Sequence, residues 1–341
     1  MNKKTGPRSV TSARSLLAAA IFLFCSTAGP LHAQEKKSIR LVLVSLSWNS
    51  ELPVRVALAK GYFKEQGLAV ESIFIRGGPA ALAALASGDA DLGSIGGAQA
   101  VIRARARGLD VSIIGSISNT TNYAVVGSKG TKSVADLKGK IVGVTGAGAF
   151  SDFAVRTYLK RNNLEPDKDV ILRAVGNTTM RAAALETGLV AAAPFSPEDA
   201  VRLTAKGFPL IVNLSESLGI PQSILIARDA MLEKYPETAK RFLKAVILGL
   251  QFAKKNKKEA VKAGYDAGLK GEPEIVNRAY DLYAPGLTAD LSIAVDGIQI
   301  MLEEDIRAGL VDKKMTVDRV INDRILKQAQ DELRREGRLI P

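Results

Sequence analysis

The sequence predicts an α/β fold of two similar lobes, each a parallel sheet covered by helices. Three observations support this prediction: strand-like apolar runs alternate with helix-like segments, this order repeats at an offset of 100 residues, and the matching helices stop at a glycine in both copies. Alternation of strand and helix is typical of parallel sheets, because every connection between parallel strands has to cross the sheet. One continuous doubly wound domain is the alternative that the pattern leaves open.

Each copy is expected to contain three strands with helices between them. The strand-like runs are 40–45, 70–75 and 91–95 in the first copy, and 140–145, 170–175 and 190–195 in the second. Short apolar runs of this kind, bounded by polar or glycine-containing loops, indicate buried strands. The helix before the third strand stops at a glycine in both copies, Gly88 and Gly188. Glycine readily adopts the left-handed backbone conformation that a helix C-cap requires.

Two further strand-like segments, 123–126 and 223–226, are predicted to cross between the lobes and to form a two-strand hinge. They divide the chain into a first lobe of residues 34–122 plus 222–341 and a second lobe of residues 123–221.

Most of the chain after Asp229 has helical patterning. One helix is expected to start near Pro236, since proline suits the first turn of a helix, and an amphipathic surface helix is expected over 317–335. These helices should cover the first lobe, because the chain has crossed back before they begin.

Residues 1–33 have the pattern of an export signal rather than of a folded segment. A basic start without acids is followed by an apolar run, and Ala33 closes a cleavage motif. A retained membrane anchor is the alternative, but the run over 15–29 is shorter than the roughly 20 residues of a spanning helix. Lipidation of Cys25 is disfavoured because Phe24 stands where a lipidation motif needs a small residue. The sequence therefore predicts a periplasmic protein with a cleaved signal peptide.

The residue types that remain after export exclude several kinds of site. Cys25 and His32 are the one Cys and the one His of the chain, so residues 34–341 contain neither. Thiolate nucleophiles, histidine bases and metal sites built from His or Cys are excluded on that ground. We predict no catalytic residue, no metal and no cofactor.

The charge of the chain is moderately basic. The net charge is +12, and four basic residues leave with the signal, which leaves +8. Lys and Arg are scattered among Asp and Glu apart from clusters at 254–258 and near the C-terminus, and no aromatic-interleaved basic patch accompanies them. We therefore predict that these charges lie on solvated helix faces and that the protein has no nucleic-acid partner.

Candidate binding residues come from the loops that follow the predicted strands, because open parallel sheets bind ligands beyond the carboxyl ends of their strands. The first crossing lies at the same level and adds one residue. The candidate ligand-binding set is Ser47, Trp48, Asn49, Arg76, Gly77, Gly78, Gly97, Asn119, Ala147, Gly148, Phe150, Ser151, Asn177 and Phe195.

The chemistry of these loops favours an anionic or neutral solute over a cationic one. The glycine-containing turn at 145–151 runs into a helix and could present free backbone N–H groups to an anion. Arg76 is the one cation in the loops and could pair with an acidic head group. Glu51, Asp152 and Glu198 lie at the starts of the following helices, where acids commonly offset the helix dipole.

The chain resembles the type II periplasmic binding proteins of the group that binds sulfonates, taurine, nitrate and thiamine-pyrimidine precursors. The matching segments are 58–68, 84–93, 133–144, 233–245 and 256–260, and the resemblance covers nearly all of residues 38–333. It implies two Rossmann-like lobes, capture of a solute between them by lobe closure, and docking to the permease of an ABC transporter in the inner membrane.

The resemblance also implies a non-enzymatic protein, expected here as a monomer. By position, the binding loops of the family fall on Trp48, Asn49, Gly77, Gly78, Gly97, Asn119, the turn at 147–151, Asn177 and Phe195. One departure is Ala191, where the family usually has Asp in the strand after the glycine that ends the helix. Two other functions stay open: an enzyme related to thiamine-pyrimidine-precursor synthesis, which uses an active-site His, and a sensory module that presents its ligand to a receptor.

Overall fold

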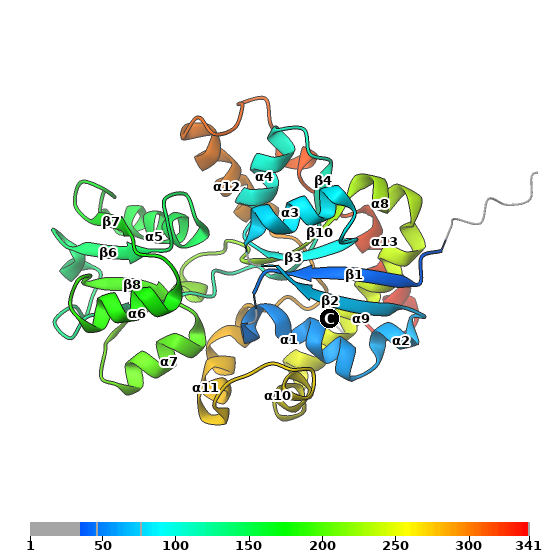
Figure 1. The fold of residues 1–341 in the computed structure, drawn as a ribbon, viewed down its shortest axis with the longest axis horizontal. Helices are drawn as coiled ribbons and strands as arrows, with labels where there is room; N and C mark the ends of the chain where they lie inside the picture. The colour runs from blue at the N-terminus through cyan, green and yellow to red at the C-terminus, as the bar shows by residue number, and fades with distance from the viewer. Residues whose placement is uncertain (1–34, 46, 76, 340–341) are drawn as a thin grey trace, which may run out of the picture. The chain divides into compact units, whose positions relative to one another are not determined.

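Two mixed β-sheets with helices packed around them form the framework of the protein (Figure 1), and each sheet has five strands. The computed structural model describes residues 35–45, 47–75 and 77–339. The expectations for the export signal, including Cys25 and His32, lie outside the described residues.

The first sheet has the strand order β2-β1-β3-β10-β4. Strand β1 runs parallel to β2 and β3, whereas β10 runs antiparallel to β3 and β4. The strands are β1 (Ser38–Leu43), β2 (Ala69–Phe74), β3 (Leu92–Gly96), β4 (Val111–Ser118) and β10 (Ser223–Arg228).

The second sheet has the equivalent order, β7-β6-β8-β5-β9. Strand β6 is parallel to β7 and β8, and β5 is antiparallel to β8 and β9. The strands are β5 (Ala124–Gly127), β6 (Ile141–Val144), β7 (Ile171–Ala174), β8 (Ala192–Phe195) and β9 (Leu210–Asn213). We call each sheet with the helices packed on it a lobe, the first lobe and the second lobe.

The expectation of purely parallel sheets is corrected by β10 and β5, which are the two predicted crossing segments. Each of these strands enters its sheet directly from the other lobe. Each of them therefore runs antiparallel to its two neighbouring strands, whose carboxyl ends face the other lobe.

The helices between the strands end where the sequence predicts. Gly88 and Gly188 adopt left-handed conformations, with φ of 81° and 74°. The helices are α1 (Trp48–Ala59), α2 (Tyr62–Glu65), α3 (Gly78–Ser87) and α4 (Gln99–Ala106) in the first lobe, and α5 (Phe150–Arg161), α6 (Thr178–Glu186) and α7 (Pro197–Ala205) in the second.

The chain after β10 is largely helical, and its first long helix starts at Pro236 as expected. The helices are α8 (Asp229–Lys234), α9 (Pro236–Lys255), α10 (Lys257–Asp266), α11 (Pro273–Tyr283), α12 (Val295–Arg307) and α13 (Arg324–Arg335). Short 3₁₀ turns occur at Ala135–Leu137, Leu214–Glu216, Ala284–Gly286 and Val317–Arg319.

The last helix starts later than the predicted 317–335. The backbone just before it lies along β4: the Ile113 N–H donates to Val320 O at 2.9 Å, and the Asn322 N–H donates to Ile113 O at 2.9 Å. Backbone groups paired with a strand cannot also pair within a helix, so α13 begins only at Arg324.

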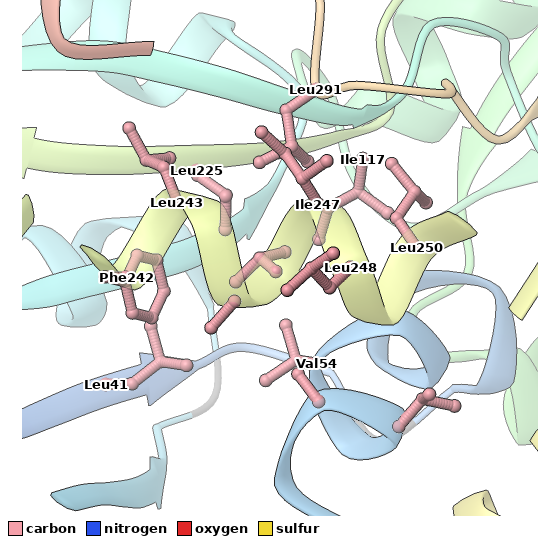
Figure 2. Packing of buried hydrophobic residues seen from close by; sticks show 14 of the residues in the cluster. Leu41, Val54, Ile117, Leu225, Phe242, Leu243, Ile247, Leu248, Leu250 and Leu291 are labelled. Carbon is pink, nitrogen blue, oxygen red and sulfur yellow. The ribbon is translucent and has the colours of Figure 1, made fainter. Parts of the chain in front are cut away.

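Helix α9 anchors the core of the first lobe. Figure 2 shows Phe242 and Ile247 of α9 in one buried cluster with Leu41 of β1 and Val54 of α1. Each such side chain contributes roughly 1.5–3 kcal/mol by leaving water. Gly249 permits the close approach of α9 to α1, because a Cβ there would lie 2.3 Å from the carbonyl oxygen of Pro53.

The two lobes also meet through helices. Val201 of α7 packs with Ile275 and Ala279 of α11 in a small buried cluster. The C-terminal helices therefore contact the second lobe at this point, in addition to covering the first. None of the helices within the described residues is both long enough and apolar enough to span a bilayer.

Candidate functional site

A cavity of about 270 Å³ lies where the two lobes face each other. On the first lobe it is bounded by the carboxyl ends of β1 and β3 and by the start of α1, and on the second by the N-terminal ends of α6 and α7. We call it the inner cavity. It is lined by Val44, Ser45, Ser47, Asn49, Ser50, Glu51, Ser94, Ile95, Gly96, Tyr123, Thr178, Ser196, Asp199 and Gln222.

A second, larger space of about 700 Å³ adjoins it, and we call it the outer groove. Helices α3 and α4 of the first lobe form most of its wall, and the turn before α5 closes it from the second lobe. The wall is mainly apolar. It consists of Gly78, Pro79, Leu82, Ala83, Ala86, Gly96, Gln99, Ala100, Arg103, Ala104, Arg107, Leu109, Ala147, Gly148, Ala149 and Phe150.

An aromatic pair stands between the two spaces. Phe150 lines the outer groove, Tyr123 lines the inner cavity, and their ring centroids are 5.9 Å apart. Phe150 also reaches the first lobe at Gly97, where a Cβ would lie 2.7 Å from its ring. Gly97 has φ of 73°, so both its backbone conformation and this contact favour glycine.

Arg103 connects the lobes along the outer groove. Its Nε and Nη2 donate to Asp305 at 2.9 and 2.7 Å, and its Nη1 donates to Gly148 O at 3.3 Å. Two of its three donor nitrogens are thus held by a buried carboxylate of its own lobe, which orients the third toward the second lobe.

The inner cavity has polar side chains without partners in its wall. Asn49 Oδ1, Gln222 Oε1 and both carboxyl oxygens of Glu51 are buried and accept no hydrogen bond from the described residues. These three residues are 2%, 8% and 1% exposed. Nearly all buried polar atoms in proteins have partners, so exceptions gathered in one cavity indicate a binding site.

Burial also changes the proton affinity of Glu51. Loss of water raises its pKa from 4.5 to about 8, and Arg55, one turn along α1, offsets only part of this effect. The carboxyl group is therefore mostly protonated at pH 7 in the ligand-free protein.

The other acid of the cavity wall, Asp199, has partners for both oxygens. Its Oδ2 accepts from Ser196 Oγ at 2.8 Å and its Oδ1 from Arg202 Nη1 at 2.9 Å. Ser196 in turn caps α7 by accepting from the Asp199 N–H. Asp199 thus supports the start of α7 while remaining at the cavity surface.

Glu198 makes a direct hydrogen bond between the lobes. Its Oε1 accepts from the Trp48 N–H at 3.2 Å, which satisfies a backbone donor at the N-terminus of α1. Burial raises the pKa of Glu198. The phenol of Tyr283 has a strongly raised pKa, because it is buried and Glu198 is close by.

Six of the predicted binding residues line these two spaces. Ser47 and Asn49 lie in the wall of the inner cavity; Gly78, Ala147, Gly148 and Phe150 lie in the wall of the outer groove. Gly97 touches Phe150, and Gly77, with φ of 91°, precedes α3 as its N-cap. Arg76 lies outside the described residues.

The structure places two predicted aromatic contacts in the core instead. The ring of Trp48 is 1% exposed, donates its indole N–H to Lys270 O at 2.8 Å and packs edge-on against Tyr265. Phe195 is fully buried in the second lobe, 5.9 Å from the guanidinium of Arg181. Trp48 belongs to the hydrophobic cluster of the first lobe, and Phe195 belongs to a cluster of the second.

Three polar candidates use their side chains within their own lobes. Asn119 Nδ2 donates to Ser292 O, and its Oδ1 accepts from the Ala294 N–H. Ser151 Oγ accepts from the Thr145 N–H, and Asn177 caps α6. These contacts are structural, and none of the three residues lines either space.

The predicted anion seat at 145–151 is largely filled by the protein itself. The Gly148 N–H donates to the carboxylate of Asp152 at 2.8 Å, and the Ala149 N–H donates to Gly146 O. A carboxylate from the first turn of α5 thus takes the place that we expected for the head group of a ligand.

Sequence reasoning missed Glu51 and Gln222 as binding candidates. Glu51 directly follows the first strand-end loop, but its position in a first helical turn suggested an acid that offsets the helix dipole. Gln222 precedes β10 at the second crossing, and only the first crossing contributed a candidate. Equal weight for both crossings would have found Gln222.

Within residues 35–45, 47–75 and 77–339, no group of three or more His, Cys, Asp or Glu side chains is arranged to hold a metal ion.

Comparison with known proteins identifies relatives of this chain. The family described as NMT1/THI5 like matches residues 48–260. A protein of Brucella abortus, provisionally named a binding protein, is 25% identical over 230 residues, which are 65% of this chain and 69% of the relative. The 4-amino-5-hydroxymethyl-2-methylpyrimidine phosphate synthase THI13 of Saccharomyces cerevisiae is 26% identical over 218 residues, which are 59% and 63% of the two chains.

Among solved structures, the periplasmic aliphatic sulphonate binding protein SsuA from Escherichia coli superposes with a TM-score of 0.70. The sequences are 18% identical, and the match covers 86% of this chain and 100% of SsuA. At this identity the likeness shows the fold, which is that of the periplasmic binding proteins, as the sequence predicted.

Proposed function

Since the chain belongs to the NMT1/THI5-like family, we propose that it is the solute-binding component of an ABC importer. In this proposal it is exported to the periplasm, captures one small organic solute between its lobes, and delivers it as a monomer to a permease in the inner membrane. The proposal goes beyond the fold in naming the site, the transport role and the location.

The observation that carries the proposal is the inner cavity with its unpartnered polar atoms. These atoms belong to three residues at the first lobe or its edge, Asn49, Glu51 and Gln222. Two residues of the second lobe, Thr178 and Ser196, line the same cavity. A solute that bonds to both walls stabilises the closed arrangement of the lobes over an open one. Such linkage between binding and closure is what a transport receptor needs.

The solute class proposed from the sequence was anionic or neutral, of the sulfonate, nitrate or aromatic type. Among the described residues that line the inner cavity there is no Lys or Arg, whereas Glu51 and Asp199 are present. These two acids disfavour an anionic head group, because like charges close together repel. The neutral part of the proposal agrees better with the cavity.

We propose a binding protein rather than an enzyme, although one relative is named a synthase. The support is chemical: residues 34–341 have no His or Cys, the residue types most often used for general-base and nucleophilic catalysis. Turnover of pyridoxal phosphate by the exported protein would favour the synthase alternative. Unimpaired growth of a deletion strain on the identified solute would instead favour a sensory role.

The test is a thermal-shift screen of the exported protein against sulfonates, nitrate, aromatic acids, pyrimidines and amines. A solute bound only by the folded state raises the melting temperature with its concentration. The Asn49→Ala variant should lose this response, whereas Asn277→Ala, an exposed asparagine on α11, should keep it. Equal responses of the two variants would place the binding site outside the inner cavity.

A further inference from the structure

One acidic side chain of the inner cavity has no hydrogen-bond partner among the residues that the structure describes. Glu51 is 1% exposed, lines the cavity, and neither carboxyl oxygen accepts a hydrogen bond from the described residues. Asparagine and glutamine can rotate to present either nitrogen or oxygen, but a carboxyl group cannot. Even when protonated, Glu51 donates through one oxygen only, so its second oxygen still requires a donor.

The neighbouring unpartnered atoms are acceptors as well. Asn49 Oδ1 and Gln222 Oε1 lie in the same cavity wall, and Ser45, Ser47 and Ser50 add hydroxyl groups that can accept. Amide and hydroxyl groups adjust to either a donor or an acceptor, whereas the Glu51 carboxyl requires a donor, so this wall favours a solute that carries N–H groups.

Among the described cations, Arg55 acts on Glu51 but offsets only part of the effect of burial, and it makes no hydrogen bond to the carboxyl group. Arg55 lies one turn along α1 and donates to Ala267 O at 3.3 Å, on the side of the helix layer. Arg181, behind the wall of the second lobe, donates to Thr145, Thr178 and the carbonyl oxygens of Gly176 and Pro194.

Apart from Arg202, which is paired with Asp199, the other titratable groups of the described residues around the cavity are acidic or phenolic. Asp199 and Tyr123 line it, and Glu198 and Tyr283 lie beside it at the contact between α7 and the first lobe. The surroundings of Glu51 therefore favour a positive charge.

We propose that the inner cavity selects a solute with a cationic nitrogen, an amine or amidine, and that Glu51 is its counter-ion. This inference rests on the proposed function and specifies its solute class. It reverses the preference for an anionic or neutral solute that the loop sequences suggested.

The inference has a measurable consequence for protons. The pKa of Glu51 is raised to about 8 in the ligand-free protein, and a bound cation lowers it. At pH 7 about nine in ten Glu51 carboxyls are protonated, so binding of a cation releases close to one proton. Affinity for the cation should rise by up to about tenfold for each pH unit between pH 6 and pH 8.

The first experiment compares solutes of equal shape and different charge. Benzamidine, benzamide and benzoate, and alkylamines with their matching alcohols and carboxylates, are screened by thermal shift at pH 6, 7 and 8. We expect the cations to stabilise the protein increasingly with pH. Glu51→Gln should weaken their binding at least tenfold, and Glu303→Gln, which removes an exposed acid on α12, should leave it unchanged.

The second experiment needs no added solute. Gln222→Lys places an ammonium group in the cavity wall, and Gln222→Met is its control for size. We expect Gln222→Lys to be tolerated when Glu51 is present and to lower the melting temperature clearly in the Glu51→Gln background. The same effect of Gln222→Lys in both backgrounds would overturn the inference.

The outcomes separate the inference from the proposed function. Stabilisation by benzoate or the alkyl carboxylates, retained in Glu51→Gln, overturns the cationic solute and leaves a solute-binding protein. If no solute in any charge class stabilises the protein, the proposed function fails, and the Gln222→Lys comparison alone decides whether the cavity accepts a cation.

Discussion

Replacement of Glu51 by glutamine should stabilise the ligand-free protein, by an amount that increases with pH. The folded-state pKa of Glu51, about 8, lies above its usual value of 4.5. Between these two values the unfolded chain releases the proton of Glu51 while the folded protein keeps it. Relative to a neutral glutamine, Glu51 therefore costs no stability below about pH 4.5. The cost grows as the pH rises toward about 8 and is nearly constant above that pH. Glutamine has nearly the same shape and no titration.

The size of the effect follows from the pKa difference, at about 1.4 kcal/mol for each unit. The gain in the free energy of unfolding for Glu51→Gln should be about 1 kcal/mol at pH 5, about 3 kcal/mol at pH 7 and nearly 5 kcal/mol at pH 9. Glu51 is almost completely buried, so solvent screening reduces these values little.

Urea unfolding at pH 5, 7 and 9, followed by circular dichroism, measures this gain directly, because urea carries no charge that could pair with Glu51. Glu303→Gln changes the net charge equally at an exposed position and should show no pH-dependent gain. A gain for Glu51→Gln that is constant across the three pH values, or a loss of stability at pH 9, would refute the reasoning about Glu51.

Two further predictions concern the contacts that hold the helices in place. Gly249→Ala should destabilise the protein by about 1–3 kcal/mol in denaturant unfolding, because the new Cβ would lie 2.3 Å from Pro53 O. The control is Gly130→Ala, where no atom lies within 4 Å of the new Cβ. It should change stability by less than half as much. The Glu198→Leu variant should be less stable than Glu198→Gln by about 1–2 kcal/mol, since only glutamine can still accept from the Trp48 N–H. Equal denaturation midpoints for the two variants would show that this hydrogen bond contributes nothing to stability.

The candidate site was predictable in its location and less so in its chemistry. Loops after the strands of both lobes were expected to face one ligand, and Ser47, Asn49, Gly78 and the turn before α5 do line the two spaces between the lobes. The direction in which each side chain points depends on packing that loop position does not reveal. Trp48 therefore belongs to the core although both of its neighbours line the cavity.

The proposed cationic solute differs from the anionic or neutral solute predicted from the loops for a related reason. Free N–H groups in a glycine-containing turn predict an anion site only if nothing else in the protein reaches them. Asp152 does reach the Gly148 N–H, at 2.8 Å, and its carboxylate comes from the next helical turn. An acid in a first turn can equally complete a turn, as Asp152 does, or face a cavity without a partner, as Glu51 does.

Three features could be predicted from the sequence: the strands, the helix ends at Gly88 and Gly188, and the repeat of one α/β unit. They depend on residues that are neighbours in the chain. The antiparallel entry of β5 and β10, the burial of Trp48 and the isolation of the Glu51 carboxyl were decided by the folded arrangement. Each of these depends on which distant segments surround a residue, and burial and missing partners are properties of those surroundings rather than of the residue.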